Sequence, residues 1–179
     1  MRLLAISGSL RQGSYNSALL EAAAAAAGCE VEVVVWRGLA AIPAFDEDLV
    51  APAAVLALRR ELARADAVLI ATPEYNASVP GALKNALDWA SRPFPANVLR
   101  GKPVAVVGAS QGLFGAVWAQ ADLRRILRTI GAQVDDRELP VGRAHEAFTE
   151  DGRLRDPELA ARLRAIVSDL VCVPGQRAA

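Results

Sequence analysis

Residues 3–16 read LLAISGSLRQGSYN, a pattern that predicts a strand, a polar loop and then a helix. The apolar run at 3–6 does not alternate with polar residues, which is typical of a strand buried on both faces. The alanine-rich run at 17–27 favours a helix that ends at Gly28. A loop in this position directs backbone N–H groups toward the helix N-terminus, where the helix dipole favours an anion.

The side chains of this first loop, residues 8–16, extend the same argument. Ser9, Ser14 and Asn16 are small hydroxyl or amide groups, and Arg11 adds one guanidinium. Neutral donors with one fork-shaped cation suit a phosphate monoester. The loop has neither a Walker A lysine nor a Gly-x-Gly-x-x-Gly pattern. A polar turn in which Ser14 only caps the following helix is the alternative interpretation.

Strand and helix patterns alternate along the rest of the chain. The predicted strands lie at 3–6, 30–36, 67–72, 103–108 and 133–139, and the predicted helices at 17–27, 53–64, 82–90, 117–130 and 157–171. Residues 37–52, 92–100 and 144–155 are expected to be loops. This alternation predicts an α/β fold, a flavodoxin-like doubly wound five-stranded parallel sheet of order 2-1-3-4-5 with helices on both faces. We expect a single domain over residues 1–172, followed by a C-terminal tail at 173–179.

Composition narrows the class of protein. The chain has 179 residues, 53% of them hydrophobic and 22% charged, and a formal net charge of +0. Zero net charge argues against a nucleic-acid partner and against an acidic electron carrier that docks by charge. Two cysteines far apart, Cys29 and Cys172, fit a reducing compartment, and we expect both to be buried. The apolar start is too short for a signal peptide, and no apolar run approaches the roughly 20 residues of a membrane span, so we expect a cytoplasmic protein without a membrane partner.

Ligands of doubly wound sheets bind beyond the carboxyl ends of the strands, where the winding reverses. This rule selects the first loop, a middle loop at 73–81 and a third loop at 109–115. Pro73 and Pro80 stiffen the middle loop. Between them, Glu74, Tyr75 and Asn76 offer a rigid polar edge beside an aromatic ring, which suits a flat heterocycle.

The third loop offers hydrogen-bonding groups and small residues. Ser110 and Gln111 could bond a ring, and Gly112 and Gly115 would let the backbone approach it closely. A ring here and a phosphate in the first loop together describe a mononucleotide.

Side chains for acid–base or metal chemistry are scarce. His145, the single histidine, falls in a polar late loop, so no Ser-His-Asp or Cys-His triad is supported. No spacing resembles a zinc site, and the acidic run at 46–48 fits a solvated loop. We therefore expect no catalytic side chain and no metal, with a cofactor carrying the chemistry.

Two stretches resemble a known family. The first loop, GSLRQGSYN, is similar to the phosphate loop of the NADPH-dependent FMN reductase family, which includes quinone, chromate and azo-compound reductases. Residues 73–89, PEYNASVPGALKNALDW, resemble its second signature, and residues 45–48 resemble its loop before the second helix. The order of elements is similar from residue 1 to about 171.

The resemblance implies bound FMN, NADPH or NADH as co-substrate, and a homodimer or homotetramer. It implies that three groups of residues contact FMN. The phosphate and ribityl group would be Ser9, Arg11, Ser14, Tyr15 and Asn16; the ring-edge group would be Pro73, Glu74, Tyr75 and Asn76; and Ser110 and Gly112 would lie beside the ring. Trp89 would anchor a subunit interface or pack in the core of its own chain. Phe114, in a third loop that departs from Gly-rich versions, would narrow the nicotinamide or acceptor pocket.

The primary hypothesis is an FMN-dependent NAD(P)H oxidoreductase. It would pass hydride from nicotinamide to bound FMN, and then electrons to a quinone-like, flavin or other small acceptor. A non-enzymatic flavodoxin-type FMN electron carrier is the first alternative. A protein that kept the fold and lost the cofactor is the second. The sequence does not discriminate NADPH from NADH and does not identify the acceptor.

Overall fold

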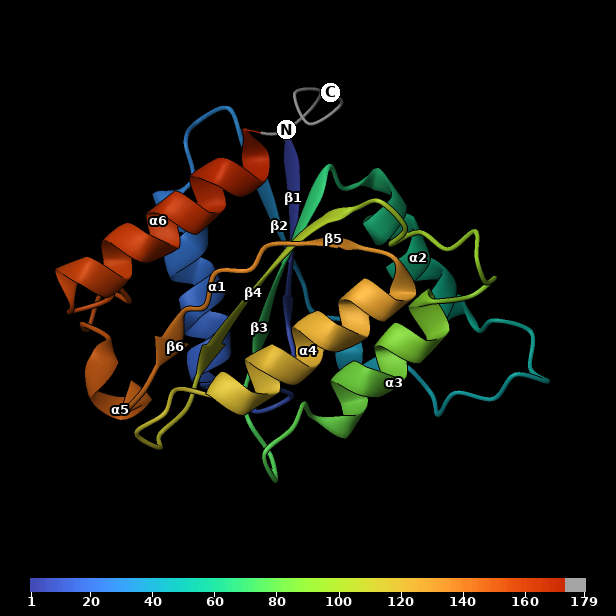
Figure 1. Cartoon of the computed structure of the whole chain (residues 1–179), viewed down its shortest axis with the longest axis horizontal. Helices are drawn as coiled ribbons and strands as arrows, with labels where there is room; N and C mark the ends of the chain where they lie inside the picture. The colour runs from blue at the N-terminus through green and yellow to red at the C-terminus, as the bar shows by residue number, and fades with distance from the viewer. Residues whose placement is uncertain (173–179) are drawn as a thin grey trace.

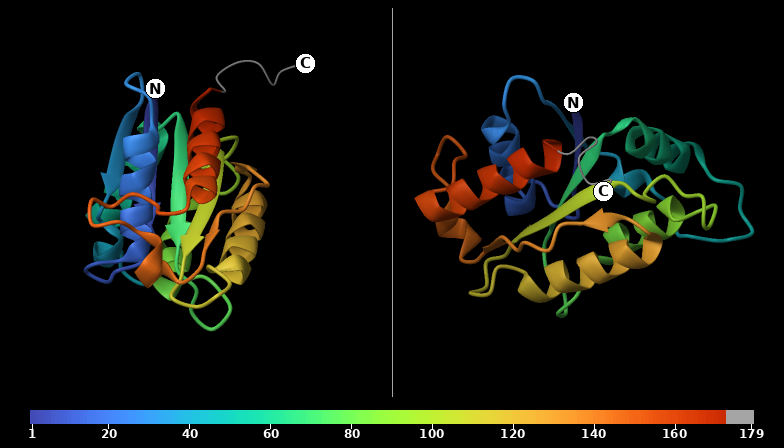
Figure 2. Two further views of the ribbon diagram at one scale, coloured as in Figure 1. Left: turned by 90° about the vertical axis from the view of Figure 1, so that its left-hand side faces the viewer. Right: turned by 45° about the horizontal axis from the view of Figure 1, so that its top comes forward.

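The computed structural model describes residues 1–172, so the predicted tail at 173–179 lies outside the described residues. A parallel sheet runs through the centre of the molecule, with helices on both faces (Figures 1 and 2). Its strands follow the order β2-β1-β3-β4-β5. These are β1 (Arg2–Ser7), β2 (Glu32–Trp36), β3 (Ala67–Thr72), β4 (Pro103–Ala109) and β5 (Gln133–Val134). The predicted fold class and strand order are confirmed.

The number of strands is where the prediction was wrong. The sheet has six strands, because β6 (Pro140–Val141) pairs with β4 beyond the end of β5. The predicted strand at 133–139 ends at Val134, where the Asp135 carboxylate accepts hydrogen bonds from the backbone N–H and the Nε of Arg137. This local turn of charged residues leads the chain away from β4. The chain pairs with β4 again from Leu139, whose carbonyl oxygen accepts a hydrogen bond from Gly108 N at 3.2 Å.

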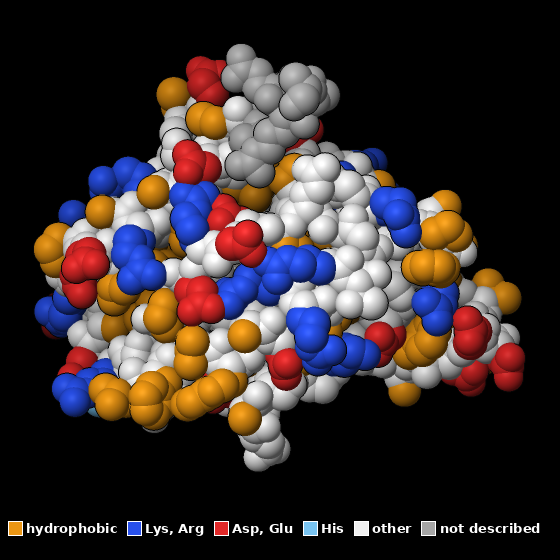
Figure 3. Space-filling view, in the orientation of Figure 1, with side chains coloured by type: hydrophobic (Ala, Val, Ile, Leu, Met, Phe, Trp, Pro, Cys, Tyr) orange, Lys and Arg blue, Asp and Glu red, His pale blue; other side chains and the backbone are white. Residues whose placement is uncertain are grey.

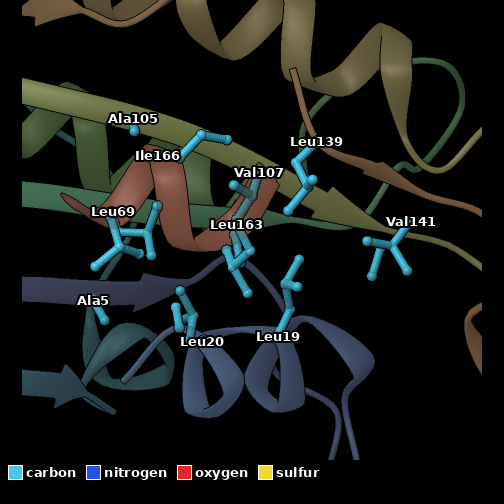
Figure 4. Packing of buried hydrophobic residues seen from close by; sticks show 14 of the residues in the cluster. Ala5, Leu19, Leu20, Leu69, Ala105, Val107, Leu139, Val141, Leu163 and Ile166 are labelled. Atoms are coloured by element: carbon cyan, nitrogen blue, oxygen red, sulfur yellow. The ribbon is translucent and has the colours of Figure 1, made fainter. Parts of the chain in front are cut away.

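Helices α1 (Tyr15–Ala26) and α6 (Pro157–Val171) cover one face of the sheet. Helices α2 (Ala53–Arg64), α3 (Gly81–Ala90) and α4 (Val117–Ile130) cover the other. Successive strand residues point to opposite faces, so Leu3 packs in one apolar core and Leu4 in the other. Figure 4 shows the core on the α1 and α6 face, where Leu19 and Leu20 of α1 and Leu163 and Ile166 of α6 meet strand side chains.

Several local predictions need correction. Helix α1 begins at Tyr15, earlier than predicted, because Ser14 Oγ accepts a hydrogen bond from Asn16 N. It ends at Ala26, and its C-cap is Ala27, in an extended conformation, rather than a left-handed Gly28. The predicted loops contain a 3₁₀ turn, η1 (Leu39–Ala41), and a short helix, α5 (Ala144–Ala147). Neither short element has the apolar repeat that marks a longer helix.

The structure also tests the predicted burial of the two cysteines and the predicted role of Trp89. Cys29 and Cys172 are free and exposed, so the expectation of burial was wrong. Both lie in the chain shortly after a helix, α1 or α6, has ended. Trp89 is 2% exposed, and its Nε1 donates to Pro43 O at 2.9 Å, so it packs within the core of its own chain. Within residues 1–172, no helix combines the length and apolarity needed to cross a membrane.

Candidate functional site

An open cleft of about 220 Å³ lies at the carboxyl ends of β1, β3 and β4. These strand ends point toward the bottom of Figure 1. All three predicted loops contribute to it. Nine of the eleven predicted site residues line this cleft, namely Ser9, Arg11, Ser14, Tyr15, Asn16, Pro73, Glu74, Tyr75 and Ser110. Ala109 and Gln111 complete the lining. Asn76 and Gly112 do not line it, and Ala109 was missed because an alanine carries no chemical signal.

The serines of the first loop are used in a way that suits an anion. Ser9 Oγ accepts from Arg11 N at 3.3 Å, and Ser14 Oγ accepts from Asn16 N at 3.2 Å. Each hydroxyl uses a lone pair within its own turn, so its O–H remains available as a donor. Ser14 therefore caps α1, as the alternative interpretation held, and also lines the cleft.

Arg11 provides the cation at the same end of the cleft. Its guanidinium donates to Gly13 O at 3.2 Å and lies 5.4 Å from the centroid of the Tyr15 ring. The Tyr15 ring lies nearly parallel to Phe148, with centroids 6.3 Å apart. Gly13 has φ +64°, a left-handed conformation that favours glycine. The positive end of the α1 dipole and this guanidinium thus lie at the same end of the cleft.

The middle loop is a tight hairpin. Tyr75 and Ser78 exchange backbone hydrogen bonds of 3.0 and 3.1 Å, and Asn76 and Ala77 between them both have positive φ. This places Asn76 at the tip of the hairpin, outside the cleft lining. Tyr75 remains 53% exposed at the cleft wall.

Glu74 has a role that the sequence did not reveal. Helix α4 has no capping side chain of its own, and its N-cap residue, Ala116, is left-handed. Glu74 Oε2 accepts from Trp118 N at 3.1 Å and Ala119 N at 3.2 Å. A carboxylate at a helix N-terminus is favoured by the exposed N–H groups and by the dipole. The middle loop is therefore attached to the start of α4.

The third loop is held by β6 and by the segment that follows it. Ser110 N donates to Val141 O, Ala144 N donates to Ser110 O, and Arg143 N donates to Gly112 O, each at 3.0 Å. Gly115 has φ +60°, and a Cβ there would lie 2.5 Å from the Pro140 carbonyl carbon. The close backbone approach at Gly115 is thus to β6. Ser110 Oγ accepts from Gly112 N, which leaves its O–H available as a donor into the cleft.

Aromatic side chains lie exposed beside the cleft. Phe114 and Trp118 pack edge to face with centroids 5.1 Å apart, and they are 60% and 49% exposed. Figure 3 shows hydrophobic side chains gathered over the loop that precedes α4. Phe114 does not line the cleft itself, so its predicted role in narrowing an acceptor pocket stays a prediction.

The described residues contain no group of three or more His, Cys, Asp or Glu side chains placed to hold a metal ion. The His145 side chain is half exposed, and its Nε2 lies 3.2 Å from Glu146 Oε1. The cleft is lined by hydroxyl and guanidinium donors of the first loop, by Pro73 and Tyr75 of the middle loop, and by residues 109–111 of the third loop. Its chemistry is binding and orientation, and the donor set suits a ligand with an anionic end.

Comparison with known proteins supplies the deciding observation. Residues 1–146, which include all three loops of the cleft, match the family model of NADPH-dependent FMN reductases. The chain belongs to the NADPH-dependent FMN reductase family. The resemblance predicted from residues 8–16 and 73–89 is thereby confirmed.

Relatives of this FMN reductase family member agree with that assignment. The chain is 45% identical over 162 residues to an NAD(P)H-dependent FMN reductase of Pseudomonas aeruginosa, covering 87% of this chain and 85% of the relative. It is 41% identical over 138 residues to a quinone reductase of Escherichia coli K12, covering 75% and 73%. A flavoenzyme NAD(P)H:(acceptor) oxidoreductase from Paracoccus denitrificans superposes with a TM-score of 0.84 at 36% identity, covering 96% and 95%.

These matches support an oxidoreductase that uses FMN and NAD(P)H, as predicted, over a non-enzymatic carrier. The cleft fits FMN on grounds of its own. A phosphate monoester accepts hydrogen bonds and carries negative charge. The first loop presents free hydroxyl donors, a guanidinium and a helix N-terminus at one place.

Proposed function

We propose that the cleft binds FMN with its phosphate in the first loop and its ring between the middle and third loops. The observation that carries this proposal is the convergence of three distant loops on one cleft with anion donors gathered at one end. Ser9, Arg11 and Ser14 would bind the phosphate. Tyr75, Pro73 and the third-loop backbone would flank the ring. When bound, FMN supplies the hydride acceptor and electron store that the protein's side chains lack.

The residues of the chain then have limited tasks. The first loop binds the anionic end and sets the register of the ligand along the cleft. The rigid middle hairpin and the third loop orient the ring, and the open mouth leaves one side accessible. We propose NADPH or NADH as the electron donor and a small quinone-like molecule as the acceptor. The names of two relatives, the quinone reductase of E. coli and a 2-hydroxy-1,4-benzoquinone reductase of a Burkholderia species, support this acceptor class.

We also propose that Asn76 contacts the ligand only from the hairpin tip and that Gly112 acts through its backbone. A homodimer or homotetramer in the cytoplasm completes the proposal. Four large apolar or aromatic side chains are exposed beside the cleft, namely Tyr75, Leu113, Phe114 and Trp118. Exposed apolar groups of this kind support an interface with another subunit.

The deciding experiment is the visible absorption spectrum of the purified protein, followed by anaerobic addition of NADPH. Flavin bands that bleach within seconds support the reductase. Bands that persist would indicate a carrier that needs a separate reductase. A colourless protein that does not bind added FMN would contradict the proposed site.

Arg11→Ala tests the orientation of the ligand. Removing the guanidinium should weaken FMN binding by about tenfold, the scale of one charge-assisted hydrogen bond, and leave riboflavin binding unchanged because riboflavin has no phosphate. Titration of flavin-free protein, followed by flavin fluorescence, measures both. Arg37→Ala is the matched control, because Arg37 is exposed and pairs with Glu21 outside the cleft. Equal loss for FMN and riboflavin would place the phosphate elsewhere.

A further inference from the structure

The Asn16 side chain is committed to the backbone of a distant residue. Its Nδ2 donates to Ala109 O at 2.9 Å, and its Oδ1 accepts from Ala109 N at 2.9 Å. Asn16 is 3% exposed and Ala109 is 2% exposed, so water does not compete for these bonds. The amide satisfies both polar groups of one residue, as the backbone of a neighbouring strand would.

Asn16 and Ala109 lie where two loops of the cleft meet regular secondary structure. Asn16 is the second residue of α1, at the end of the first loop. Ala109 is the last residue of β4, where the third loop begins. Both also line the cleft. The pair therefore joins the end of the cleft that holds the anion donors to the end proposed for the ring.

The backbone of Asn16 is fixed as well. Its N–H donates to Ser14 Oγ, so the side chain projects from a capped helix turn rather than from a free loop. A buried amide bonded at both ends cannot turn toward a ligand without breaking both of its bonds to Ala109, and the loss of hydrogen bonds between buried groups is costly. Asn16 thus differs from Ser9 and Ser14, whose O–H groups remain free to donate.

We propose that Asn16 is a positioning residue that holds the third loop against the first at the spacing the flavin ring requires. This inference rests on the proposed function, because it assumes that the cleft takes a flavin. It assigns to Asn16 a role that is independent of the ligand's phosphate.

Asn16→Ala tests the proposal through two ligands, FMN and riboflavin, titrated into flavin-free protein. Loss of the two bonds lowers the population of the binding-competent third loop, so both ligands should bind about tenfold more weakly with their ratio unchanged. A loss confined to FMN would show that Asn16 serves the phosphate and would overturn the proposal. Unchanged binding of both would overturn it equally.

Asn97→Ala is the matched control. Asn97 is also a buried asparagine bonded to backbone, with Nδ2 donating to Ile130 O at 3.1 Å and Oδ1 accepting from Leu99 N at 3.0 Å, but it does not line the cleft. Its loss should destabilise the fold while leaving both flavin affinities within twofold of the wild type. Equal weakening of flavin binding in both variants would reduce Asn16 to a general stabilising residue.

Two further measurements apply if Asn16→Ala does not fold. Asn16→Asp keeps the acceptor for Ala109 N and loses the donor to Ala109 O, and it is assessed with riboflavin, which has no phosphate for the new charge to repel. Weaker riboflavin binding supports the proposal, and wild-type affinity overturns it. Hydrogen exchange at Ser110 N, which donates to Val141 O in the third loop, should also be faster in flavin-free Asn16→Asp, whereas an unchanged rate counts against the proposal. Failure of the wild type to bind FMN would instead refute the proposed function, which separates the two failures.

Discussion

The first and third loops line the same cleft, but their shapes have different origins. In the first loop, Ser9 and Ser14 bond N–H groups two residues ahead, and Arg11 reaches Gly13 O. In the third loop, backbone groups of Ser110 and Gly112 bond residues 141–144, about thirty positions later in the chain. The turns within the first loop are therefore closed by short-range bonds, whereas the backbone of the third loop is held mainly by distant contacts.

The difference explains where the sequence was informative. The conformation of a loop closed by short-range bonds can be predicted from Gly, Ser and Asn at particular positions in its own sequence. A loop held from a distance carries glycines whose partners are invisible in its own sequence. Gly115 is an example, because its close neighbour is Pro140 of β6 rather than a residue of the third loop. The following predictions test this contrast in the flavin-free protein, from the largest expected effect to the smallest.

Gly142→Ala should have the largest effect. A Cβ at Gly142 would overlap the Leu113 carbonyl oxygen and lie 2.9 Å from its carbonyl carbon, so the third loop would have to move. We expect a loss of about 3 kcal/mol in the free energy of unfolding, at the upper end for overpacking. Urea denaturation measures it. Gly28→Ala, where a Cβ meets nothing within 4 Å, should change stability little. Similar stabilities for the two variants would break the contrast.

Gln120→Met should have an intermediate effect. The buried Gln120 amide donates to Gly115 O at 3.0 Å and accepts from Leu139 N at 3.2 Å, so it holds the end of the third loop beside β6. Methionine keeps the side-chain length but leaves these backbone groups unpaired, at a cost of about 2 kcal/mol. Urea denaturation again provides the measurement, with exposed Gln133→Met as control. A wild-type midpoint would show that the third loop does not depend on Gln120.

Glu74→Ala should have the smallest effect of the three. It removes the carboxylate that caps α4 through Trp118 N and Ala119 N, and loss of a helix cap costs about 1 kcal/mol. Thermal unfolding, with exposed Glu150→Ala as control, measures the difference. No difference between the variants would mean that the middle loop does not support the start of α4.

Much of the fold and site was predictable because local rules apply to them. Non-alternating apolar runs identified the buried strands, and the winding rule placed the cleft at three named loops. Nine residues of the predicted site line the cleft for the same reason. The wrong predictions concern features that depend on how distant parts of the chain pack. The second half of the predicted last strand, residues 135–139, is a charged segment that leads to β6, and Cys29 and Cys172 lie exposed after helix ends.

The sequence by itself determined the class of fold, the strand order and the family, and it predicts an anion site at residues 8–16, because each depends on residue type and short-range spacing. Only the tertiary structure decided what Asn16, Glu74 and Gln120 do. Each of these side chains forms hydrogen bonds with backbone groups. Every residue type has a backbone carbonyl and nearly every one a backbone N–H, so the sequence does not indicate which residue will be the partner. The fold brings these partners within hydrogen-bonding distance once the two cores have packed.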